Sequence, residues 1–223
     1  MATSPRVAFL ASLPVLEWGE FIAGADPCRK RALVSPHLTA ADWAILRPLF
    51  LLAIERGAAG RSLERAIAAA FDVAASSAFV RTCMEESRLA VRIGIALERS
   101  RVFLNNATAA RLLPFAQWRC SIDSERCPHA ALGGRVIPSG SSLLRSYFPP
   151  LSETCFCTLA PVSAPRARRE AAGFVFLLEE EVRHLVAPLW GGAPLPQLAS
   201  EATCREVLTQ GEAILSGLGI IWR

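Results

Sequence analysis

The sequence predicts an α+β protein: a helical N-terminal part, then a small loop-rich β segment, then C-terminal helices. Three observations lead to this fold class. Apolar residues recur every three or four positions across 62–101, which is the period of an amphipathic helix. Residues 117–122 alternate between apolar and polar, as in a half-buried strand. Apolar residues make up 52% of the 223-residue chain and charged residues 20%, so the composition supports a folded core.

The first part of the chain is expected to be irregular. Residues 1–38 contain scattered proline and glycine and no strong period, which predicts an irregular N-terminal arm with at most one short helix. Thr39 then resembles a helix N-cap, because Asp42 stands three residues later and an apolar pattern follows. Pro48 lies inside that pattern and should kink or delay the helix.

The predicted helical region covers 39–116. Its clearest members are a helix that begins near Ser62 and a second that covers about 79–101. On the second, Leu89, Ile93, Ala96 and Leu97 are expected to form the apolar side. A short helix is expected at 107–113, before Pro114.

The composition and the apolar spacing of the sequence change at residue 117. Glycine and proline pairs interrupt residues 117–160, so this small β/loop segment needs packing partners or a staple to hold it together. Residues 161–223 are predicted to form a C-terminal helical extension. Its last helix runs from Glu201 to about Leu215.

Charge and hydropathy limit the classes of protein. The net charge of +4 is mild for a dedicated nucleic-acid binder. Lys30 is the only lysine among 24 basic residues. A GC-rich genome explains this bias, and so do arginine forks that bind phosphate or carboxylate. No secretory signal stands out, and prolines interrupt the longest uncharged run, 184–200. We therefore expect a soluble protein with no membrane partner.

Familiar catalytic motifs are absent from the sequence. It contains no Gly-x-x-x-x-Gly-Lys phosphate loop, no Gly-x-Ser-x-Gly elbow and no His-Glu-x-x-His helix. Glu181-x-x-His184 is half of a di-iron motif, but the second half is missing. We therefore expect that the protein is not an enzyme. A small hydrolase that pairs Cys127 or Cys155 with His129 is a weaker alternative, because nothing singles out such a pair.

Four arginines share one face of the predicted helix at 79–101. Arg81, Arg88, Arg92 and Arg99 follow one another at spacings of seven, four and seven. Such a stripe is either a solvated helix face, where Glu85 forms local ion pairs, or a contact surface for DNA phosphates or an acidic partner.

Seven cysteines are present, four of them between residues 120 and 157. An odd number without an export signal argues against a secreted disulfide framework. Cys127, His129, Cys155 and Cys157 could close a tetrahedral zinc site, with Cys120 able to replace any one ligand. Such a structural zinc ion would stabilise a segment with little core. Buried thiols are the alternative interpretation.

An ordered set of short motifs runs through residues 81–157. The first is a helix start rich in arginine, and the second is a strand with a tryptophan that leads to an aspartate. A histidine close to a Leu-Gly-Gly turn and a short strand comes third, and an aromatic-Pro-Pro stretch with Cys-x-Cys comes last. These are Arg81-Thr82-Cys83-Met84-Glu85 with Arg88, Arg92 and Gly94; Trp118 to Asp123 with Glu125-Arg126-Cys127-Pro128; His129 to Ile137; and Tyr147-Phe148-Pro149-Pro150 with Cys155-Phe156-Cys157.

In order and spacing this set resembles the phage Mu F-like head-morphogenesis (minor capsid protein) family. The resemblance covers roughly a third of the chain. Gly133 stands where that family usually has aspartate, Phe156 stands where arginine is common, and Phe148 is inserted before the proline pair. These departures put any carried-over polar role at 133 and 156 in doubt.

The resemblance implies a structural virion protein of a tailed phage or prophage, present in few copies. Its implied roles are head assembly, portal-vertex organisation, and DNA packaging or ejection. Its implied partners are the portal protein, the major capsid protein and packaged DNA. Its implied location is the head interior or portal vertex, after assembly in the host cytoplasm. A stand-alone, zinc-stabilised nucleic-acid-binding module is the alternative.

Overall fold

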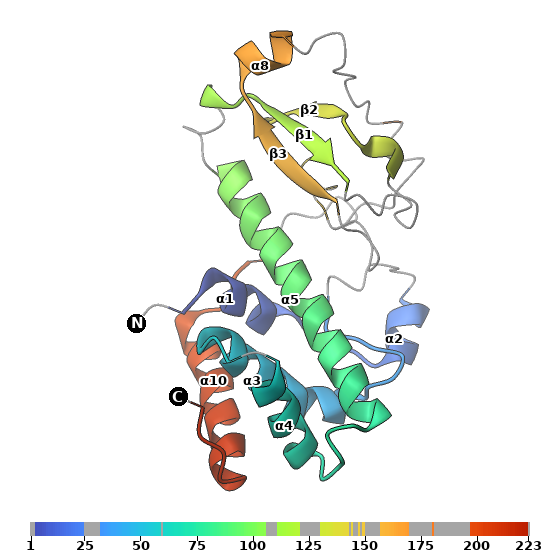
Figure 1. Ribbon diagram of the computed structural model, residues 1–223, viewed down its shortest axis with the longest axis vertical. Helices are drawn as coiled ribbons and strands as arrows, with labels where there is room; N and C mark the ends of the chain where they lie inside the picture. Colours follow the sequence, from blue (N-terminus) through green and yellow to red (C-terminus); the bar gives the residue numbers. More distant parts are fainter. Residues whose placement is uncertain are drawn as a thin grey trace. The chain divides into compact units, whose positions relative to one another are not determined.

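A computed structural model describes residues 3–24, 32–58, 60–105, 111–120, 130–142, 144, 147, 149, 157–169, 180 and 197–222, with the backbone alone for 96–105 and 167–169. The chain divides into two compact units, one formed by Met1–Gly94 with Pro196–Arg223 and the other by Ile95–Leu195. The predicted α+β class is confirmed: a helical N-terminal part, a small sheet and a C-terminal helix follow one another (Figure 1). Within the described residues, no helix is long and apolar enough to cross a membrane.

The stretch expected to be an irregular arm contains two helices, α1 (Pro5–Ser12) and α2 (Trp18–Ala23). Ser4 caps α1, since its Oγ accepts a hydrogen bond from the Val7 amide at 3.3 Å. Pro5 occupies the first turn, where its missing N–H costs no helical hydrogen bond. The apolar run after it is core, because Val7 and Leu10 have no exposed surface.

Helix α3 (Ala40–Glu55) confirms the predicted cap. The Thr39 hydroxyl accepts from the Asp42 amide at 3.2 Å, and the Asp42 carboxylate accepts from the Thr39 amide at 2.8 Å. This reciprocal pair satisfies two amides that a helix start leaves unpaired. Pro48 lies inside α3, and the helix continues past it to Glu55. The buried side of α3 includes Trp43, Leu46, Leu49 and Phe50.

Helices α4 (Arg61–Ala70) and α5 (Ala78–Asn105) are separated by a turn. Asp72 adopts a φ of 50° there, a left-handed conformation that Asp tolerates better than most residues. The rings of Phe71 and Phe79 meet across the turn, edge to face, with centroids 4.9 Å apart. Apolar spacing therefore continues through a segment whose backbone is not helical.

The buried side of α5 differs in part from the expected one. Leu89 is only half-buried, whereas Ile93 is buried as expected. Ser87 is buried because its hydroxyl donates to the Cys83 carbonyl at 2.8 Å and so needs no water. The described residues buried along this helix are Val80, Cys83, Met84, Ser87, Ala90, Ile93 and Gly94.

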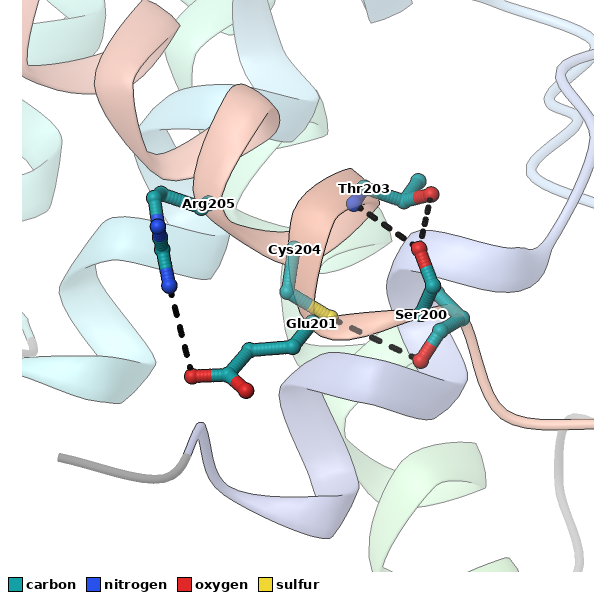
Figure 2. A network of polar contacts seen from close by, with 6 residues as sticks. Ser200, Glu201, Thr203, Cys204 and Arg205 are labelled. Carbon is teal, nitrogen blue, oxygen red and sulfur yellow. Dashed lines mark hydrogen bonds and ion pairs between the residues drawn. The ribbon is translucent and has the colours of Figure 1, made fainter.

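Helix α10 (Glu201–Gly217) returns to the first unit and packs on α3 and α1. Figure 2 shows its start, where the Ser200 hydroxyl accepts from the Thr203 amide at 3.1 Å and lies 2.9 Å from the Thr203 hydroxyl. Arg205 lies 3.5 Å from Glu201 one turn away. The predicted terminal helix is therefore present, with a serine cap just before it.

The second unit contains a three-stranded antiparallel sheet of order β2-β1-β3 (Figure 1). Strand β1 (Phe115–Arg119) is central, between β2 (Val136–Pro138) and β3 (Thr158–Val162). The strand predicted at 117–122 thus begins two residues earlier and ends at Arg119. A short 3-10 turn, η3 (Ala130–Leu132), precedes β2, and α8 (Ala164–Arg169) follows β3.

Candidate functional site: a cysteine pair at the sheet and an arginine face on α5

One face of the small sheet supports an apolar cluster. Ala116 and Trp118 alternate along β1 and are fully buried, as strand periodicity requires. They pack with residues from three other parts of the second unit. The buried members of this cluster are Ala116, Trp118, Leu132, Ile137, Leu144, Tyr147 and Cys157, with Cys120 and Leu159 half-buried against it.

Cys157 and Cys120 lie at the same end of the sheet. Cys157 immediately precedes β3 and is buried, with 5% of its surface exposed, while Cys120 immediately follows β1 and is half-buried. Their sulfur atoms are 2.9 Å apart. The structure therefore brings together two of the clustered cysteines from positions 37 residues apart.

The rest of the predicted zinc set lies outside the described residues. This applies to Cys127, His129 and Cys155. Where the structure describes the chain, it contains no group of three or more Cys, His, Asp or Glu side chains that could hold a metal ion. Cys157 and Cys120 together offer two thiolate ligands, and zinc in a closed structural site usually takes four.

Gly133 has a physical reason to be glycine. A Cβ added at this position would lie 2.9 Å from the carbonyl oxygen of Ala130, which belongs to the backbone of η3. It would also lie 3.8 Å from the sulfur of Cys120. The aspartate that the family resemblance suggests at this position would therefore require the η3 turn to move.

The arginine face of α5 is described in part. Arg81 and Arg88 are exposed, and the Arg81 guanidinium donates to the Ser76 carbonyl at 2.7 Å, just before the helix. Arg92 is half-buried. Arg99 lies in α5, but its side chain is outside the described atoms. Arg88 is therefore the predicted contact residue whose side chain is best placed to meet a partner.

The remaining described cysteines have a different environment. Burial raises the pKa of Cys83 to about 12, and the negative charges of Asp42 and Glu86 add to the effect. Burial also raises the pKa of Cys204, with a contribution from Glu55. Because the thiolate is the reactive form, these two thiols are expected to be inert.

The sequence alone predicts Cys120 to be a substitute zinc ligand and does not predict its pairing with Cys157. The signal that joins them is the register between β1 and β3, in which Arg119 lies opposite Thr158. Cys120 and Cys157 are the next pair along. That register depends on contacts between distant segments, which no local pattern in the sequence specifies.

Comparisons with models of protein families, with curated proteins and with solved structures find no match. The assignment of a function therefore rests on the residues of this chain and on their arrangement.

Proposed function

We propose that this chain is a minor head protein of a tailed phage or prophage, with a structural role in head assembly at the portal vertex or in DNA packaging or ejection. Its partners would be the portal protein, the major capsid protein and packaged DNA. In this role it works by binding and not by turnover, and it resides in the virion.

The observation that carries this proposal is the way the motifs between Trp118 and Cys157 contribute to one cluster. Trp118 comes from the strand motif, and Leu132 and Ile137 from the motif that begins at His129. Tyr147 comes from the aromatic-Pro-Pro motif, and Cys157 from Cys-x-Cys. These four segments are separated in sequence, yet each places a residue in the same apolar core. The motifs between Trp118 and Cys157 are thus also packing partners, whereas the helix start at Arg81 places no described residue in this cluster. Their shared core supports interpreting residues 118–157 as one structural unit.

The exposed arginines of α5 support a binding role. Arg88 projects from a helix whose opposite side is anchored in the core by Cys83, Ser87 and Ala90. The helix fixes the spacing of its arginines along one side, where Arg81 and Arg88 are exposed. Exposed arginines on one helix face suit phosphates or an acidic protein surface.

Quantitative mass spectrometry of purified particles and proheads from the source phage or induced strain tests the proposal. We expect the chain at a few to tens of copies per particle, beside portal and major capsid protein. Its absence from both mature particles and proheads would refute the head assignment. A tail-only preparation is the control, because a minor head protein is depleted there.

A zinc-stabilised nucleic-acid-binding module is the second candidate, favoured by the proximity of Cys120 and Cys157 at a loop-rich sheet end. It predicts stoichiometric zinc in the purified chain, loss of stability on chelation, and DNA affinity that falls steeply with salt. A zinc-free chain with an unchanged melting temperature in chelator would eliminate it.

A further inference from the structure

The two strands that end at Cys120 and Cys157 meet in a register that suits a covalent link. Phe115 lies opposite Val162 and Arg119 opposite Thr158, so the antiparallel ladder puts Cys120 opposite Cys157. Residues directly opposite each other in such a ladder have the shortest distance between strands. The two cysteines are therefore cross-strand neighbours and not a chance encounter of two loops.

The hydrogen bonds of β1 show whether Cys120 and Cys157 form a hydrogen-bonded or a non-hydrogen-bonded pair of the antiparallel ladder. The Trp118 amide donates to the Arg135 carbonyl at 2.8 Å, and the Trp118 carbonyl accepts from the Gly134 amide at 2.8 Å. Both polar groups of Trp118 therefore point away from β3. The direction of the backbone N–H and C=O alternates from one residue of a strand to the next, so those of Cys120, two residues after Trp118, also point away from β3. The pair of Cys120 and Cys157 is therefore of the non-hydrogen-bonded kind. Such pairs have Cα atoms about 4.5 Å apart, within the range that a disulfide spans.

The side chains are already directed at each other. The sulfurs are 2.9 Å apart, and a disulfide bond of about 2.05 Å would need a movement of less than about 1 Å. Two thiolates on one tetrahedral zinc ion, each at about 2.3 Å from the metal, lie about 3.8 Å apart. Closing to a disulfide needs no further residue, whereas zinc ligation would require ligands outside the described residues.

We propose that Cys120 and Cys157 form a reversible disulfide that links β1 to β3 when the protein meets a disulfide oxidant such as oxidised glutathione. Cys120 is the more exposed thiol, so its thiolate attacks one sulfur of the oxidant, forms a mixed disulfide and releases one thiol. The Cys157 thiolate then attacks the Cys120 sulfur and releases the second thiol. In total the pair loses two electrons and two protons, and one oxidant disulfide becomes two thiols. A reducing dithiol reverses the reaction.

The link would close the chain between residues 120 and 157, the segment that the sequence predicts to need a staple. Restricting the unfolded chain in this way stabilises a fold. In the reducing cytosol the pair stays as thiols, and outside the cell it closes. This inference does not depend on the proposed function, and either can fail alone.

The test uses the full chain, incubated with oxidised glutathione and then blocked with an alkylating reagent under denaturing conditions. Non-reducing peptide mapping should find one intramolecular crosslink, between the peptides that carry Cys120 and Cys157, and both should be alkylated when the chain is first reduced. Hydrogen exchange of the β1 and β3 amides should slow several-fold on oxidation. Cys120→Ser should abolish the crosslink and the slower exchange, whereas Cys83→Ser with Cys204→Ser should change neither.

Three results would overturn the proposal. The first is a chain that shows no such crosslink after oxidant has fully oxidised a reference dithiol peptide. The second is a crosslink that joins Cys120 or Cys157 mainly to another cysteine. The third is stoichiometric zinc, added as the metal alone, that protects both thiols from oxidation and from alkylation in the native chain. The wild-type map decides the matter even if the serine variants fail to fold.

Discussion

Gly211 of α10 lies directly against the carbonyl oxygen of Pro48 on α3. A Cβ added at Gly211 would come within 2.6 Å of that oxygen and 3.2 Å of the Leu52 Cβ. Both neighbours belong to a helix whose backbone is held by the core around it. The absence of a side chain at 211 is therefore what lets the two helices approach this closely.

Gly211→Ala should destabilise the first unit by about 1–3 kcal/mol, because overpacking against a helix backbone outweighs the gain of about 1 kcal/mol in helix propensity. Gly217→Ala is the matched control: it is on the same helix, and its added Cβ would meet nothing within 4 Å. Urea denaturation of both variants measures the difference. Equal free energies of unfolding for the two variants would show that α10 moves away from α3 without a loss of stability.

Gly133→Asp should weaken the small sheet, although the family resemblance suggests aspartate there. The new Cβ would lie 2.9 Å from the Ala130 carbonyl oxygen, so η3 must move at a cost of about 1–3 kcal/mol. Gly140→Ala, which meets nothing within 4 Å, is the comparison. Hydrogen exchange at the β1 and β2 amides reports on this unit specifically, and unchanged exchange in the aspartate variant would contradict the expectation.

Cys83 should give the protein a measurable alkaline pH dependence. Burial raises its folded-state pKa from 9.0 to about 12, so the unfolded chain loses this proton first. The resulting stability is complete below pH 9 and is lost as pH rises toward 12, with a slope of at most about 1.4 kcal/mol per pH unit. Cys83→Ala removes that contribution.

Unfolding free energies of the wild type and of Cys83→Ala, measured across that pH window, should therefore converge as pH rises. Any cavity left by the missing sulfur costs the same at every pH and shifts the two curves by a constant. Curves that stay parallel would mean that the Cys83 thiol titrates normally in the folded protein.

Arg88→Glu should reduce incorporation of the chain into particles, or reduce its affinity for DNA, if the arginine face makes the proposed contacts. Arg65→Glu is the matched control, because Arg65 is also an exposed arginine on a helix and has the same change of charge. Circular dichroism of both variants should match the wild type. Equal incorporation of the two variants would return the face to the role of a solvated helix surface.

The sequence predicted the helices well where an N-cap residue is followed by apolar residues at helical spacing. The Thr39 and Asp42 box and the helix from Glu201 appear in the structure as the sequence predicts. Two misses have physical causes. The Ser4-Pro5 start of α1 is a valid cap signal, but the short apolar run after it has no strong helical period. The helix predicted from near Ser62 ends at Ala70, because the turn at Asp72 interrupts apolar residues whose spacing continues to Phe79.

The candidate site was less accessible to sequence reasoning. Cysteine clustering drew attention to this region, but the partner of Cys157 depends on which residue of β1 lies opposite it. Likewise, Gly211 carries no local signal, because its role exists only through Pro48, which lies far away in the sequence. Relationships of this kind depend on long-range packing, whereas caps and periods are properties of a few adjacent residues.

The return of α10 to the first unit has a consequence during synthesis. The Ala199 amide donates to the Ala8 carbonyl at 2.9 Å, and α10 covers α3, yet residues 95–195 are translated between these partners. During translation, the face of α3 that α10 will cover therefore stays exposed until the whole second unit has been synthesised. Joining Ala8 to Ala199 closes a loop of about 190 residues, and the entropic cost of closing a flexible loop rises only slowly with its length. The first unit can therefore be completed only after the second has been synthesised, although the insertion adds little to the entropic cost.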